Sequence, residues 1–193
     1  MTAAASPPPA STSAFMVWDD LFTPAELDAL ERHGDSLMPQ KAAIAAPTGD
    51  DDAVRITQVA WIANSPAAAP FYEKLAGAVR HLNSRFYRYD VTGLETLQYT
   101  VYHADQGGHY HWHMDYGIHN PRPRKISMTL QLTDPARYEG GDLQFQAGHT
   151  TASAPRRRGA LIAFPSFILH RVTPVTAGTR KSLVAWAAGP DFR

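Results

Sequence analysis

The chain has 193 residues, with 18 basic and 18 acidic side chains, nine histidines and no cysteine. This length suits a single globular domain, and an apolar fraction of 44% argues against a disordered chain or a coiled coil. Because the net charge is zero, the chain has no general attraction to phosphate backbones or anionic lipid, so we expect neither nucleic acid nor a membrane as a partner. Without thiolates, any bound metal must be held by imidazole and carboxylate groups.

The amino-terminal residues predict little structure. Residues 1–13 contain Pro7-Pro8-Pro9 and no large apolar cluster, so we expect a disordered tail, with residues 14–193 forming one domain. The first basic residue is Arg32, which leaves this end without the positive region of a secretory signal. No apolar run approaches the ~20 residues that span a bilayer. We therefore expect a cytoplasmic protein.

Residues 14–92 are expected to form a supporting region with two helices. The first helix begins at the capping signal Thr23-Pro24-Ala25-Glu26, flanked by the staple pair Phe22 and Leu27, and ends near Gly34. The second begins at Ser65-Pro66 and carries an apolar stripe to about residue 86. The remaining expectations are strands at 15–18 and 54–62 and a loop at 39–52, where Asp50 to Asp52 form a solvated charge run.

From Leu94 onward the apolar pattern changes to the period of two that is typical of strands. Short strands without intervening helices indicate a sandwich or barrel. We therefore expect an α+β protein in which residues 93–193 form a double-stranded β-helix, or jelly roll. The predicted strands are residues 95–103, 108–116, 125–132, 142–146, 160–164, 168–173 and 179–187.

Five of the nine histidines fall between His103 and His119. Successive side chains of a strand point to opposite faces, so the alternating residues His109, His111, His113 and Asp115 are predicted to share one face. Two ligands separated by one residue on a strand can reach the same metal, as His113 and Asp115 would. His111 with His113 is the rival pair, but no glutamate follows it at a short spacing.

His170 is the best candidate for a third ligand, because it follows the apolar strand at 160–164. Two imidazoles and one carboxylate form the facial triad that holds Fe(II) and leaves positions open for other ligands. Arg180 follows His170 by ten residues, with a turn at Gly178 between them. Its guanidinium could grip a carboxylate near the metal; the alternative is a surface cation on an edge strand.

The order of motifs along residues 93–189 resembles a known family. These residues are similar to the Fe(II)- and 2-oxoglutarate-dependent dioxygenases of the prolyl 4-hydroxylase type, especially the bacterial PKHD-type hydroxylases. The first 90 residues match that family only loosely. The matching blocks are Tyr102, Gly107-Gly108, Tyr110 to Asp115, Arg124 to Leu132, Tyr138 to Leu143, Gly159 to Pro165, His170 to Val175, and Gly178 to Arg180.

The resemblance implies a hydroxylase that uses Fe(II), 2-oxoglutarate and O2, with ascorbate as a reductant. Such an enzyme would hydroxylate a C–H bond of an amino acid, a peptidyl (prolyl-type) residue or a small metabolite, and release succinate and CO2. Its partner would be a small molecule or a short peptide. The implied residues are His113, Asp115 and His170 for the metal; Arg180, Tyr102 and Gln131 for 2-oxoglutarate; and Tyr110, Trp186, Arg122 and Arg124 for the substrate pocket.

Several alternatives remain open at the level of the sequence. The same three ligands could hold zinc and a hydrolytic water, or the jelly roll could bind a metal or ligand without catalysis. Trp186 could be a core residue, and Arg122 and Arg124 could be loop cations. One extra residue separates Tyr102 from the metal motif relative to the family. No sequence feature indicates an oligomeric state or selects the substrate.

Overall fold

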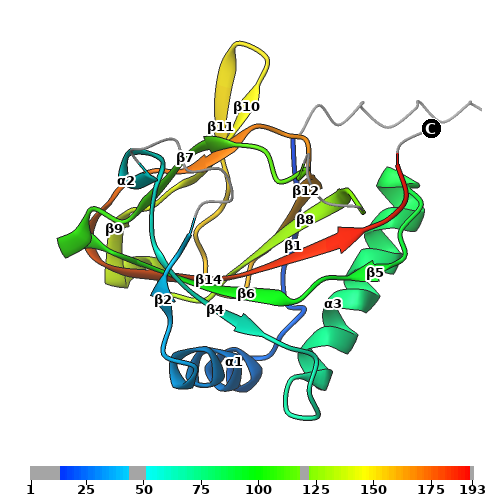
Figure 1. The fold of residues 1–193 in the computed structure, drawn as a ribbon, viewed down its shortest axis with the longest axis horizontal. Coiled ribbons are helices and arrows are strands. Elements are labelled where there is room, and N and C mark those ends of the chain that lie inside the picture. The colour runs from blue at the N-terminus through cyan, green and yellow to red at the C-terminus, as the bar shows by residue number, and fades with distance from the viewer. Residues whose placement is uncertain (1–13, 44–50, 118–121, 192–193) are drawn as a thin grey trace, which may run out of the picture.

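The computed structural model describes residues 14–43, 51–117 and 122–191. The predicted tail and Asp50 lie outside these residues. Two antiparallel sheets face each other, and α1 (Pro24–Ser36) and α3 (Ala69–Leu82) cover the outer face of the larger sheet (Figure 1). Shorter helical segments are α2 (Asp51–Val54), the π turn η1 (Asn83–Tyr87), and the 3-10 turns η2 (Ala104–Gln106) and η3 (Pro135–Arg137).

The larger sheet, called the major sheet below, has the order β1-β12-β8-β14-β6-β4-β2, and β5 and β9 also pair with β14. The smaller, minor sheet has the order β11-β10-β13-β7-β3. Strands of the major sheet are β1 (Met16–Trp18), β2 (Gln40–Lys41), β4 (Gln58–Ile62), β5 (Gly93–Leu94), β6 (Leu97–His103), β8 (Arg124–Gln131), β9 (Tyr138–Gly140), β12 (Leu161–Pro165) and β14 (Val175–Ala188). Those of the minor sheet are β3 (Arg55–Ile56), β7 (His109–His113), β10 (Leu143–Ala147), β11 (Thr150–Ser153) and β13 (His170–Val172).

The start of α1 follows the predicted capping signal. The Thr23 side chain accepts a hydrogen bond from the Glu26 backbone N–H, and the Glu26 carboxylate accepts one from the Thr23 backbone. Phe22 and Leu27 are both buried, as the staple requires. Leu27 and Leu30 then pack against the outer face of the major sheet.

Three predictions about the first half were wrong in detail. The strand expected at 54–62 is broken at Thr57, which sends β3 into the minor sheet and β4 into the major sheet. The second helix begins at Ala69, after a turn closed on the Ser65 carbonyl, rather than at Ser65. The segment expected to be a loop contains β2 and α2. Among the barrel strands, β9 and β11 were missed because both are short and largely polar.

The two faces of the major sheet carry different side chains. In β6, β8 and β14 one set of alternating residues is apolar and packs under the helices, including Tyr99, Met128 and Leu183. The other set faces the minor sheet, and many of its members are buried and polar. Burying a polar group costs free energy unless the group is hydrogen-bonded or paired. The polar members are Gln98, Thr100, Ser127, Thr129, Gln131, Arg180 and Ser182.

Within the described residues, no helix is both long enough and apolar enough to cross a lipid bilayer.

Gly178 is expected to tolerate no side chain. Its φ is +71°, and an added Cβ would overlap the carbonyl oxygen of Arg137, the residue before the paired strand β9. Gly107 is a matched control because its φ is +65° but nothing lies within 4 Å of an added Cβ. We expect Gly107→Ala to lower the free energy of unfolding by about 1–2 kcal/mol, the cost of a left-handed backbone. Gly178→Ala should cost clearly more in denaturant unfolding, and equal losses would contradict the overlap.

Candidate metal centre

A bulge in β7 decides which of its side chains face the interior. His113 lies opposite His170 of β13, whereas Tyr110 lies opposite Val172, so four residues of β7 lie opposite three of β13. Paired residues share a face, so the bulge turns both Tyr110 and His113 inward. The prediction that His109, His111, His113 and Asp115 share one face was therefore wrong. His111 is exposed, and the His109 ring bonds the Gly107 carbonyl instead of lining the cavity.

His113, Asp115 and His170 come together between the two sheets. Their ligand atoms all lie within 4.8 Å of one another. The Asp115 carboxylate lies between the two imidazoles, with Oδ1 3.7 Å from His113 Nε2 and Oδ2 3.6 Å from His170 Nε2. These two imidazoles and one carboxylate are the donor set of the facial triad that holds Fe(II).

Backbone carbonyls fix the orientation of both rings. Nδ1 of His113 is 2.7 Å from the His111 carbonyl, and Nδ1 of His170 is 2.9 Å from the Ile168 carbonyl. Because a carbonyl can only accept, each Nδ1 carries the proton, which leaves each Nε2 with a free lone pair. This arrangement is the usual way in which a protein prepares histidine as a metal ligand.

The electrostatics keep these groups in the protonation states that a metal needs. Burial, reinforced by the neighbouring His170, lowers the pKa of His113 to about 3, so this imidazole is neutral at pH 7. Burial alone would raise the pKa of Asp115, but the neighbouring histidines, the Ser127 hydroxyl and the Trp186 indole outweigh it and lower that pKa. Asp115 is therefore an anionic ligand candidate.

Two buried serines hold the Asp115 carboxylate. The Ser127 hydroxyl donates to Asp115 Oδ2 at 2.8 Å, and Ser166 Oγ lies 2.9 Å from Ser127 Oγ. Because the single Ser127 proton is used on Asp115, Ser166 must donate to Ser127. The Ser166 carbonyl also accepts from the Asp115 backbone N–H at 2.9 Å. These contacts, called the serine relay below, tie the end of β7 to β8 and to the residue after β12.

Arg180 lies in the same cavity as the three ligand candidates. It is 1% exposed, yet it forms no ion pair with the described side chains. Its Nη2 donates to Gln131 Oε1 at 2.9 Å and its Nη1 donates to Ser182 Oγ at 3.3 Å, while its Nε is buried without a partner. Such an unpaired buried cation calls for an anionic ligand.

The other predicted cosubstrate residues surround Arg180. Tyr102 is buried, with its ring centroid 5.3 Å from the Arg180 guanidinium carbon. Gln131 accepts from Arg180 and donates to the Pro155 carbonyl, so it orients the guanidinium. Direct contact of Tyr102 or Gln131 with 2-oxoglutarate stays a prediction.

The predicted substrate residues divide between the cavity and an outer groove. Tyr110 lines the cavity, with its ring stacked on His113 at a centroid distance of 3.4 Å. Trp186 forms part of the cavity wall and is also covered from outside by Arg124, whose guanidinium carbon lies 3.8 Å from the indole centroid. Arg124 is paired with Glu95 at 2.8 Å. Arg122 lines the outer groove of about 730 Å³, together with Arg124 and Trp61.

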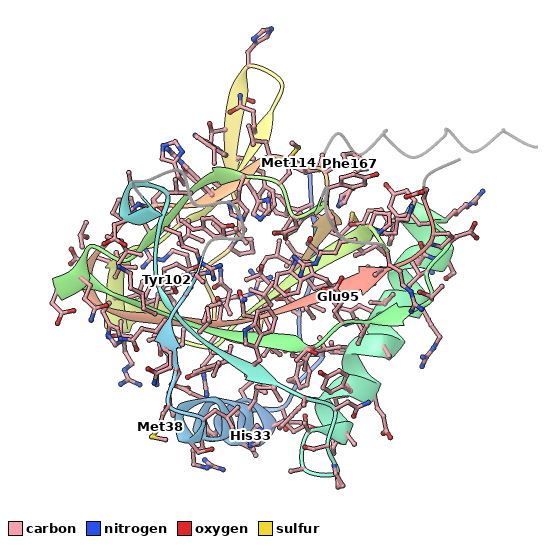
Figure 2. The ribbon with its side chains drawn as sticks, in the orientation of Figure 1. His33, Met38, Glu95, Tyr102, Met114 and Phe167 are labelled. Atoms are coloured by element: carbon pink, nitrogen blue, oxygen red, sulfur yellow. The ribbon has the colours of Figure 1, made fainter. Side chains whose placement is uncertain are left out.

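The cavity and the groove follow the major sheet from end to end. Tyr102 pairs with Arg180 near one end of β14, and the Glu95 backbone bonds Trp186 near the other. Figure 2 shows Tyr102 and Glu95 toward opposite sides of the molecule, and it shows Met114 and Phe167 on its upper side. Met114 and Phe167 are 56% and 44% exposed, so they form an apolar surface close to the ligand candidates.

Sequence reasoning missed three residues of this site. Ser127 and Ser166 could have been noticed as polar residues within or beside otherwise apolar strands. Arg55 lines the cavity next to Tyr110, with its guanidinium carbon 4.5 Å from the Tyr110 ring centroid. No local signal marks Arg55, because its position depends on the pairing of β3 with β7, more than fifty residues later.

Comparison with known proteins identifies the family of the segment that carries the site. A family model of the 2OG-Fe(II) oxygenase superfamily matches residues 97–188. Residues 97–188 belong to this superfamily. The matched oxygenase segment includes His113, Asp115, His170 and Arg180, and its family implies Fe(II), 2-oxoglutarate and O2 as cofactor and cosubstrates.

Curated relatives of the oxygenase segment are PKHD-type hydroxylases. The protein of Idiomarina loihiensis is 34% identical over 103 residues, which cover 51% of this chain and 47% of the relative. That of Picosynechococcus sp. is 38% identical over 93 residues, covering 48% and 42%. The chain thus spans less than half the length of these relatives.

Solved structures extend the likeness to nearly the whole chain. A prolyl-4-hydroxylase of Pseudomonas putida has a TM-score of 0.71 and 21% identity, covering 92% of this chain and 94% of that one. A prolyl hydroxylase of Trichoplax adhaerens, solved with a peptide fragment of the hypoxia inducible factor, has a TM-score of 0.73 and 17% identity, covering 91% and 83%. The expected fold, a jelly roll supported by helices, is confirmed.

The serine relay leads to a prediction about metal affinity. Ser127→Ala removes the donor to Asp115 Oδ2, and outer hydrogen bonds of this kind typically contribute about 10–100-fold to metal affinity. We expect Mn(II) to bind Ser127→Ala at least about tenfold more weakly in a calorimetric titration. Ser153→Ala, on the exposed strand β11, is the control and should bind Mn(II) like the wild type. Unchanged affinity in Ser127→Ala would show that the relay does not hold the carboxylate for the metal.

Proposed function

We propose that this protein is an Fe(II)- and 2-oxoglutarate-dependent dioxygenase that hydroxylates a C–H bond and releases succinate and CO2. One observation carries the proposal: a single cavity contains the largely buried cluster of His113, Asp115 and His170 and, separately, the cation Arg180, which has no ion-pair partner among the described residues. The first fits the metal and the second fits the distal carboxylate of 2-oxoglutarate.

The residues present fit an Fe(II) ion. Both imidazoles have a free Nε2, and the carboxylate is anionic and fixed by the serine relay. Three protein ligands on one side leave positions open for the cosubstrates, which is the arrangement of non-haem Fe(II) oxygenases. We infer that His113, Asp115 and His170 are the ligands.

The residues also fit a dicarboxylate. Arg180 has a buried Nε without a partner, and Gln131 and Ser182 fix the remaining geometry of the guanidinium. A guanidinium held in this way can bind a carboxylate through two parallel hydrogen bonds. We infer that Arg180 binds the end of 2-oxoglutarate that lies farther from the metal, with Tyr102 close to it.

The oxidative chemistry comes from the iron and its cosubstrates, which together can insert one oxygen atom into a C–H bond. The protein itself binds and orients the metal, the cosubstrate and the substrate, and it excludes water. Trp186, Tyr110 and Val172 form an apolar wall around the ligand cluster, and this wall keeps bulk water out. No side chain has to act as a nucleophile, which agrees with a cavity whose charged members are two arginines and Asp115.

The substrate belongs to this proposal as well. We infer a small molecule or a short peptide segment, bound in the outer groove beside Trp61, Arg122 and Arg124 and reaching the cavity past Trp186. The peptide bound by the Trichoplax adhaerens relative supports a peptidyl substrate, and the proteins named PKHD-type hydroxylases support hydroxylation. We also propose a cytoplasmic location and no nucleic-acid or membrane partner.

Arg180 gives the sharpest test of the proposed activity. Arg180→Met should raise the KM for 2-oxoglutarate by about 10–100-fold, because charged hydrogen bonds contribute roughly 1.5–3 kcal/mol. The measurement is succinate release with Fe(II), ascorbate and O2. Lys181→Met is the control, since Lys181 is the next residue but pairs with Glu31 and Asp35 on the opposite side of the strand.

Two results would overturn the proposal. Turnover with zinc that does not depend on 2-oxoglutarate would indicate a hydrolase with the same three ligands. If the protein takes up metal but releases succinate with none of the compounds in a broad substrate screen, it is a non-catalytic binding protein.

A further inference from the structure

The cavity contains a second arginine, Arg55, which has no role in the proposed reaction. It lies on β3, paired with Tyr110 of β7, and therefore shares the inward face of that strand. The cavity is lined by three charged side chains among the described residues: Arg55, Arg180 and Asp115. Asp115 is committed to the metal cluster, and Arg180 to the cosubstrate.

The contacts of Arg55 leave its charge unbalanced. Its guanidinium carbon lies 4.5 Å from the centroid of the Tyr110 ring, and this ring stacks on His113, one of the ligand candidates. Its Nη2 donates to Gln98 Oε1 at 3.1 Å, and its Nε is buried without a partner. It forms no ion pair with the described side chains.

When the cavity holds a metal ion and 2-oxoglutarate, its charges sum to one excess positive charge. A divalent metal and the doubly charged 2-oxoglutarate cancel, and Arg180 and Asp115 also cancel. The positive charge of Arg55 remains. A half-buried cation without an acidic partner costs free energy, and this cost falls when an anion binds beside it.

We propose that Arg55 binds a carboxylate of the substrate and thereby selects carboxylate-bearing compounds. This inference rests on the proposed function and names its substrate class. The Tyr110 ring and Gln98 hold the guanidinium beside the ligand cluster, which leaves the donors on Nε and Nη1 available to a carboxylate. Two sources share this chemistry: the α-carboxylate of a free amino acid, and the side-chain carboxylate of Asp or Glu in a peptide.

The test measures binding rather than turnover. Full-length protein is loaded with Mn(II) and 2-oxoglutarate without O2, and 2-oxoglutarate binding is confirmed first, so that failure of the proposed function would show at this step. One arm then titrates the free amino acids against their carboxamides. The other arm titrates blocked tripeptides with a central Asp or Glu against those with Asn or Gln.

In at least one arm we expect the wild type to prefer the carboxylate by about tenfold or more, the usual contribution of a charged hydrogen bond. Arg55→Met should reduce this preference to less than about twofold while 2-oxoglutarate binds as before. Arg55→Lys should keep part of the preference, because it keeps the charge but loses the planar fork. The Lys variant also serves if the Met variant does not fold.

Arg171→Met is the matched control. Arg171 lies over another β7 aromatic residue, 4.6 Å from the Trp112 centroid, and donates to Gln144, but it does not line the cavity. This variant should keep the full carboxylate preference. The proposal is overturned if the wild type shows no carboxylate preference in either arm, or if the preference survives in Arg55→Met. It is also overturned if Arg55→Met loses 2-oxoglutarate as fully as Arg180→Met, because Arg55 would then serve the cosubstrate.

Discussion

The site depends on the way one carboxylate is held between two sheets. Asp115 follows a strand of the minor sheet, but its side chain is fixed by Ser127 of the major sheet and by Ser166 beyond β12. Without this connection the buried carboxylate would lose its hydroxyl donor, which costs free energy in a medium of low polarity. The bulge in β7 is the second requirement, because it turns His113 toward His170.

The alternating side chains of the major sheet form both the apolar core and the polar wall of the cavity. Its outward residues form an apolar core under α1 and α3, which supplies the stability. Its inward residues are polar and buried, and they build a line of hydroxyl, amide and guanidinium groups along β14 and its neighbours. The stability given up to bury Arg180 without an acidic partner is understandable if the ligand of the cavity is itself an anion.

The sequence predicted the fold class and the main strands because their signals are local: a capping box at Thr23, and period-two apolar segments after residue 94. It also singled out His113, Asp115, His170 and Arg180, and the structure brings these four into one cavity. What it could not predict depends on pairing between distant segments. The bulge at Tyr110 to His113 exists only opposite β13, and the place of Arg55 exists only opposite β7. A strict alternation rule therefore misplaced His109 and His111.

The central claim is that the metal cluster and Arg180 serve one ligand that spans both. Such a ligand must couple the two sites, and the coupling must be equal in both directions. The most direct measurement is the affinity of 2-oxoglutarate with and without Mn(II), together with the affinity of Mn(II) with and without 2-oxoglutarate. The account predicts that each strengthens the other by the same factor, of about tenfold or more. Affinities that do not depend on each other would contradict it.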